Sequence, residues 1–125
     1  MPTSSSELLS ATLDFTELSS HNILNGCAGC LDGWLCGIKV PGAKHTSNII
    51  SYFLGHYQCY GLNIQAPCDA CCHFTLVSVL SPGGTGDSKA FFGSRLLYDF
   101  IQGLPAGFYM IADNAYMLLE HLLIP

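Results

Sequence analysis

The stretch GFYMIAD, residues 107–113, decides the fold that the sequence predicts. It is a short, continuous apolar run that follows a turn containing Pro and Gly, and it ends on an acid. Such a run is typical of a strand buried on both faces of a sheet. Because a helical segment precedes it, the run predicts a crossover connection, and so a strand parallel to one already in the sheet.

The helical segment begins at Asp87, which we interpret as its N-cap, and Gly103 followed by Pro105 is a typical stop. Its apolar residues recur at helical spacing and form one face. The first row is Phe92, Leu96 and Phe100, and the adjacent row is Leu97 and Ile101.

Three strands are predicted before this helix, over residues 26–34, 55–69 and 73–81, with the turn SPGGTGD (81–87) after the third. The sequence therefore predicts an α/β domain with a mixed sheet: three antiparallel strands, a helix and a parallel fourth strand. Residues 1–25 are polar and helix-leaning, and we interpret them as a lead-in to a domain spanning residues 26–125.

Composition limits the function classes. The 125 residues are 50% hydrophobic and 10% charged, which is typical of one globular domain. No apolar run reaches the roughly 18 residues of a membrane helix, so we expect no membrane partner. The net charge of −5 argues against a stand-alone nucleic-acid binder. Seven cysteines without a secretion signal predict mostly free thiols in a reducing compartment.

Asp32 and Asp113 are the candidate site residues, since each lies at or near the end of an apolar run. If the last strand pairs with the first, the two carboxylates lie side by side at one sheet edge. A divalent cation would relieve their repulsion and could support phosphoryl chemistry. The alternative is structural: Asp32 caps a turn before Gly33, and Asp113 caps a helix that begins at Asn114.

The ordered motifs resemble the DDE-type transposases of the PIF/Harbinger group. LDGW (31–34) resembles the first-strand Asp-Gly motif, and residues 52–88 resemble the next two strands with a glycine-rich turn and a trailing Asp. GFYMIADNAYMLLEHLLIP (107–125) resembles the fourth strand with the second catalytic Asp. The resemblance covers roughly residues 15–125.

The resemblance implies an RNase H-like nuclease domain that hydrolyses and transfers DNA phosphodiesters. It implies that Asp32 and Asp113 are catalytic and hold Mg²⁺ or Mn²⁺. It also implies action in the nucleus, with a separate Myb-like DNA-binding partner protein.

The sequence departs from the family pattern in three ways. The family's third acid lies downstream of residue 125, and Glu120, the only acid after Asp113, stands in another motif context. The helix that should carry this acid is also unmatched. Leu54, Gly55 and His56 replace a basic pair that the family often has before the second strand. We therefore predict a C-terminally truncated domain with apolar surface exposed at that edge.

The departures leave several origins open. The chain could be a fragment, a truncated gene product or a degraded element copy, and we expect little or no nuclease activity from it alone. It could also be a transposon-derived protein that keeps the fold without the chemistry.

A second hypothesis rests on two CxxC pairs, Cys27 with Cys30 and Cys68 with Cys71. Four thiolates could hold a structural zinc in a non-catalytic interaction module, and Cys72 and His73 add further ligands. Against this, regular strand alternation would turn the first two thiols to opposite faces of the sheet.

Overall fold

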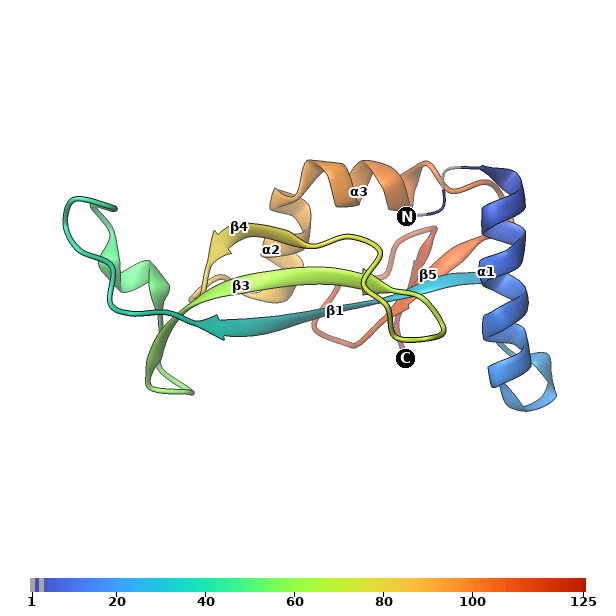
Figure 1. Cartoon of the computed structure of the whole chain (residues 1–125), viewed down its shortest axis with the longest axis horizontal. Helices are drawn as coiled ribbons and strands as arrows, with labels where there is room; N and C mark the ends of the chain where they lie inside the picture. The colour runs from blue at the N-terminus through green and yellow to red at the C-terminus, as the bar shows by residue number, and fades with distance from the viewer. Residues whose placement is uncertain (1, 3) are drawn as a thin grey trace.

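The structure is a computed structural model that describes residues 2 and 4–125. It is a mixed α/β arrangement in which three α-helices accompany a six-stranded sheet (Figure 1). In chain order the elements are α1 (Ser5–Leu18), η1 (Ser20–Asn22), β1 (Cys27–Gly37), η2 (Ile49–Tyr52), β2 (Phe53–Leu54), β3 (Cys59–Cys68), β4 (Ser78–Pro82), α2 (Asp87–Gly93), α3 (Arg95–Gln102), β5 (Tyr109–Ala112) and β6 (Leu122–Leu123).

The sheet has the predicted topology. Strand β3 pairs antiparallel with both β1 and β4, and β5 returns after the helices to pair parallel with β1. The parallel fourth strand beside the first is thus confirmed. The sheet is also wider than predicted, because β2 pairs with β3 and β6 pairs with β5. These added strands have two residues each, too few to show a sequence period.

The predicted single helix from Asp87 is wrong in two respects. It is two helices, because the poor helix formers Gly93 and Ser94 end α2 and α3 starts anew at Arg95. The N-cap of α2 is Gly86, and Asp87 is its first residue, with a side chain that is used elsewhere. The C-terminal stop at Gly103 is confirmed.

The break also changes which helical face is buried. Phe92 and Leu96 of the predicted first row are 42% and 64% exposed, whereas Leu97 and Ile101 of the adjacent row are fully buried. The buried residues join one hydrophobic core that extends from α1 to β6. Its members are Leu8, Ala28, Leu31, Phe91, Leu97, Ile101, Leu104, Met110, Tyr116 and Leu122.

Helix α1 belongs to this core. Its N-terminus is a capping box, in which the Ser4 side chain accepts from the Glu7 amide and the Glu7 carboxylate accepts from the Ser4 amide. It buries Leu8 and Phe15 and packs against β1. The helical nature of the lead-in is confirmed, and its division from the domain at residue 25 stays a prediction.

Three further expectations differ from the structure. The predicted strand over 73–81 is regular only from Ser78, preceded by an isolated bridge between Cys68 and Phe74. Only Met110 of β5 is fully buried, so the other face of this strand is partly open to solvent. No helix begins at Asn114, because residues 114–116 form a turn.

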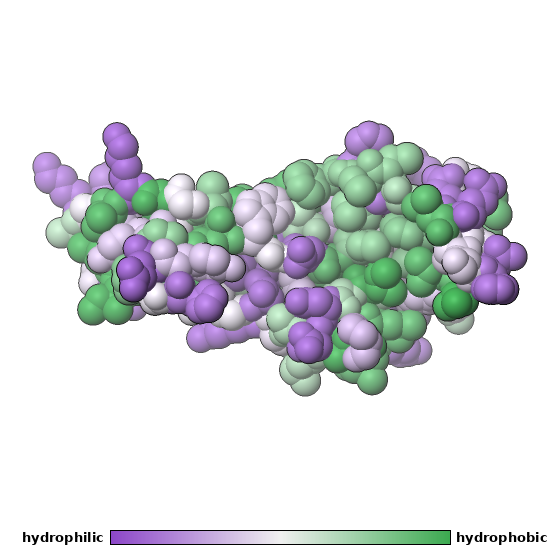
Figure 2. Space-filling view, turned by 90° about the horizontal axis from the view of Figure 1, so that it is seen from below, coloured by the Kyte–Doolittle hydropathy of each residue, from purple (hydrophilic) through white to green (hydrophobic). Residues whose placement is uncertain are grey.

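Apolar side chains also reach the surface. Figure 2 shows a broad apolar area on the underside of the molecule, over the body and away from the arm formed by residues 38–58. In the C-terminal segment Met117, Leu118 and Leu123 are 56%, 63% and 39% exposed, as expected for this edge. Within the described residues, no helix has the length and apolar character that crossing a bilayer requires.

Candidate active site

The pairing of β1 with β5 sets the position of the two candidate aspartates. The last paired residues of these parallel strands are Leu31 and Ala112. Asp32 follows Leu31 within β1, and Asp113 is the first residue after β5, so the two aspartates lie at neighbouring positions where the β1–β5 pairing stops. The expected placement of Asp32 at the end of its strand is wrong, because β1 continues to Gly37 and stays paired with β3. Both side chains are exposed to solvent. The predicted pairing of the last strand with the first is confirmed, whereas the close approach of the two carboxylates and their metal-binding and catalytic roles stay predictions.

Each aspartate also makes a local hydrogen bond. Asp32 Oδ1 accepts from the Gly33 amide at 2.8 Å, but both residues lie within strand β1, so the turn that the structural alternative expected at this position is not formed. Asp113 Oδ1 accepts from the Ala115 amide at 2.9 Å, which forms a turn and not a helix cap. These bonds fix the orientation of each carboxylate.

A third carboxylate, that of Asp87, lies in the same region. Its Oδ1 accepts from Asn63 Nδ2 at 2.9 Å and from Gln65 Nε2 at 3.0 Å. Gln65 pairs across the sheet with Gly33, the residue after Asp32. A Cβ at Gly33 would collide with Asp87 Oδ1 and Gln65 Nε2, so the glycine leaves the space that this contact fills.

Tyr116 connects these groups. Its buried hydroxyl donates to Gln65 Oε1 at 2.6 Å. Burial raises the pKa of Tyr116 well above its usual range, and the negative charges of Asp87, Asp32 and Asp113 raise it further. Asp87, Asp32 and Asp113 therefore all favour the protonated form of this hydroxyl.

The buried amides are the functional residues that sequence reasoning missed. Gln65 is 1% exposed, and its Nε2 also donates to Asn63 Oδ1 at 2.7 Å. Together with the Tyr116 bond, this network ties the turn after Asp113 to the middle of β3. The signal was present, since Asn63 and Gln65 lie two apart in a strand and so share one face.

The arrangement suits a hard cation and an extended substrate. The exposed carboxylates of Asp32 and Asp113 offer oxygen ligands of the kind that Mg²⁺ prefers, with room for its retained water molecules. Beside Gly33 and Asp87 lies an open cavity of about 650 Å³, also lined by Trp34, Tyr57 and Thr85. Thus there is space next to the Asp87 carboxylate for part of a larger ligand.

The cysteines form a different arrangement from the predicted tetrad. The pairing of β1 with β5 shifts register between Cys27 and Gly29, so the side chains of Cys27 and Cys30 do not follow regular strand alternation. A hydrogen bond between these two side chains lowers the pKa of Cys27. Burial raises the pKa of Cys68, with the Cys30 charge as the next cause. Among the described residues, one group of three metal-ligating side chains lies close together, and of the four cysteines in the two CxxC pairs it contains Cys71 alone.

The predicted four-cysteine zinc site is therefore not assembled. All seven cysteines, each within the described part of the chain, are free, as expected.

Comparison with known proteins identifies the family. The family described as DDE superfamily endonuclease matches residues 31–125, which include both candidate aspartates and Asp87. No curated protein and no solved structure matches the chain. Such domains indicate transposase-like nuclease function on DNA, and they generally use divalent metal ions. Since the match covers most of the chain, the protein belongs to the DDE superfamily endonucleases.

Proposed function

We propose that this chain is part of the catalytic domain of a PIF/Harbinger-type transposase with an RNase H-like fold. Its reaction in the full-length form is hydrolysis and strand transfer of DNA phosphodiesters. The observation that supports the proposal is the parallel pairing of β1 with β5, because Asp32 and Asp113 directly follow Leu31 and Ala112, the last paired residues. The family match over residues 31–125 supports the same assignment.

In this proposal Asp32 and Asp113 hold Mg²⁺ or Mn²⁺. A bound divalent ion supplies activation of water and stabilisation of the leaving oxygen. The chain's own contribution is to keep the two carboxylates in place. The amides of Gly33 and Ala115 orient them, and the buried bond from Tyr116 to Gln65 holds the turn that follows Asp113.

Partners and location follow from the same family assignment. The substrate is DNA, although the net charge of −5 and only four Lys and Arg residues give the chain little attraction for phosphate. A separate Myb-like DNA-binding protein would supply that attraction, and the site of action would be the nucleus.

A metal titration of the purified chain tests the proposal. We expect Mn²⁺ or Mg²⁺ to raise the thermal unfolding temperature, because a ligand that binds only the folded state stabilises it. The double variant Asp32→Asn, Asp113→Asn should lose this effect. Asp14→Asn, which removes an exposed acid from α1, is the matched control and should keep it. Equal stabilisation of all three proteins would refute a metal site at the two aspartates.

A cleavage assay adds a second criterion. The family's third acid has no match within residues 1–125, so we expect this chain alone to cleave DNA little or not at all with either metal. Magnesium-dependent cleavage that needs Asp32 and Asp113 would show that the third acid is dispensable or is replaced within this chain.

A further inference from the structure

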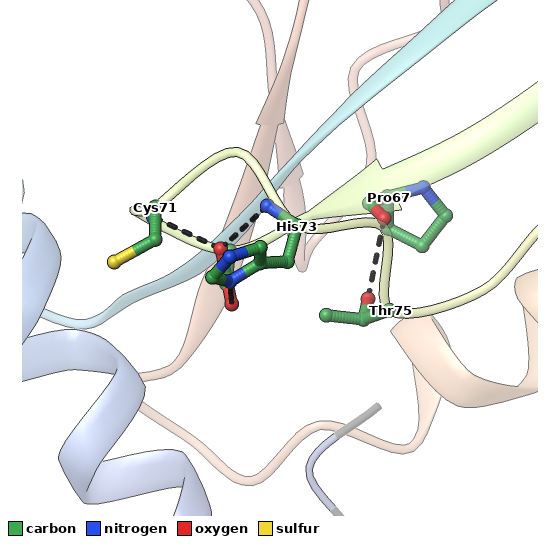
Figure 3. A network of polar contacts seen from close by, with 5 residues as sticks. Pro67, Cys71, His73 and Thr75 are labelled. Carbon is green, nitrogen blue, oxygen red and sulfur yellow. Dashed lines mark hydrogen bonds and ion pairs between the residues drawn. The ribbon is translucent and has the colours of Figure 1, made fainter.

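A turn outside the site described above gathers three different metal-ligating side chains. Asp69, Cys71 and His73 lie between β3 and β4, and one ligand atom from each lies within 4.8 Å of the other two. The thiol and the imidazole are exposed, and the carboxylate is partly exposed. Figure 3 shows Cys71 and His73 projecting from the same short loop.

The turn itself is well fixed by hydrogen bonds. Asp69 Oδ1 accepts from the backbone amides of Cys71 at 2.9 Å and His73 at 2.8 Å. The Asp69 amide donates to the His73 carbonyl at 3.0 Å, which closes the loop. At its base the Thr75 amide donates to the Pro67 carbonyl at 2.9 Å. The three ligand-bearing residues are therefore presented by a preformed backbone.

The side chains already converge in pairs. Asp69 Oδ2 lies 3.1 Å from His73 Nδ1, at the distance of a shared proton. A metal ion could replace that proton, or bind the other ring nitrogen while the carboxylate orients the imidazole. Tetrahedral zinc needs ligand atoms roughly 3.5 Å apart. The carboxylate and the imidazole are already this close, and the sulfur of exposed Cys71, which lies within 4.8 Å of both, can approach them by rotation of its side chain.

We propose that Asp69, Cys71 and His73 form a zinc-binding site. One thiolate, one imidazole and one carboxylate are a donor set that zinc accepts, whereas magnesium and calcium prefer oxygen ligands alone. Binding would displace the Cys71 thiol proton and leave a fourth position for water or a further ligand. This site is separate from Asp32 and Asp113, and it does not depend on the function proposed for them.

The structure also provides a reporter of zinc at this turn. Phe74 follows His73 directly and stacks on Trp34, with ring centroids 5.3 Å apart and an interplanar angle of 15°. Trp34 is the only tryptophan of the chain. Ordering of the turn by zinc should therefore change the fluorescence of this one residue.

The experiment is a zinc titration of the full 125-residue chain, followed by Trp34 emission and by equilibrium dialysis. We expect one zinc ion per chain, with affinity reduced at least about tenfold in Cys71→Ser and in His73→Gln. Cys36→Ser removes another exposed thiol, on β1, and should bind as the parent chain does. The double variant Asp32→Asn, Asp113→Asn should also bind zinc normally.

Cobalt gives a test that needs no variant, because a thiolate-to-cobalt charge-transfer band in the parent chain reports cysteine ligation directly. Absence of zinc binding by the parent chain would overturn the proposal. So would unchanged binding by Cys71→Ser and His73→Gln. Zinc binding that is lost in Cys30→Ser but kept in Cys71→Ser would overturn it too, and would move the site to the inner thiols.

Discussion

Replacing Gly33 by Ala tests the central contact of the candidate site. A Cβ at this position would collide with Asp87 Oδ1 and Gln65 Nε2, which hydrogen-bond to each other directly above the glycine. Gln65 has little freedom to yield, because it is fully buried and also holds Tyr116. The added methyl group must therefore break or stretch the Gln65–Asp87 bond.

The magnitude follows from two opposing effects. Loss of one partly buried, charge-assisted hydrogen bond, such as that from Gln65 to Asp87, costs about 1.5–3 kcal/mol. Replacing glycine by alanine within a strand stabilises the fold by roughly 0.5–1 kcal/mol, because it lowers the backbone entropy of the unfolded chain. The net destabilisation is about 0.5–2.5 kcal/mol, or a fall in the unfolding temperature of roughly 2–12 °C for a chain of this size.

The assay is urea unfolding followed by Trp34 emission, with Gly37→Ala as the matched control. Gly37 lies on the same strand, and a Cβ there would have no atom within 4 Å. The control should be neutral or slightly more stable than the parent chain. If Gly33→Ala and Gly37→Ala unfold with free energies within about 0.5 kcal/mol of each other, Asp87 and Gln65 do not meet over Gly33.

Two further substitutions test the remaining polar contacts. Tyr116→Phe leaves buried Gln65 Oε1 without its donor, so we expect a loss of about 1–3 kcal/mol in urea unfolding. Because the pKa of Tyr116 in the folded state is raised above 10.0, the stabilisation from its protonated hydroxyl is complete below that pH and is lost as the pH rises further. Tyr116→Phe should not show this loss of stability at alkaline pH. Backbone and side-chain hydrogen bonds from His73 hold the pKa of the partly exposed Asp69 carboxyl below 3.8. The stabilisation that the ionised Asp69 carboxylate gives to the folded chain is therefore present above that pH, and it is lost as the pH falls through the pKa of the folded state. Between about pH 5 and pH 3, Asp69→Asn should therefore lose less stability than the parent chain does. A variant with the same pH profile as the parent chain would contradict either assignment.

Local sequence pattern determined the elements and their connection. The apolar run at Tyr109–Ala112 after a helical segment was enough to predict a parallel strand, because the crossover rule leaves one handedness and direction. That rule, together with the position of each acid beside an apolar run, led to the neighbouring placement of Asp32 and Asp113. The only long-range contact that this placement of the two aspartates required was the pairing of the last strand with β1.

Tertiary structure decided what each polar group does. Asp87 has the sequence position of a helix cap, yet its carboxylate accepts from Asn63 and Gln65 of β3, 24 and 22 residues earlier in the chain. The bulge after Cys27 likewise cancels the strand alternation that the sequence implies. The hydrogen-bond partner of a side chain depends on which donors the folded sheet brings within about 3 Å of it. The spacing of residues along the chain carries no information about these partners. The sequence by itself therefore determined the order and direction of the strands, whereas only the packed structure decided the partners of the buried side chains.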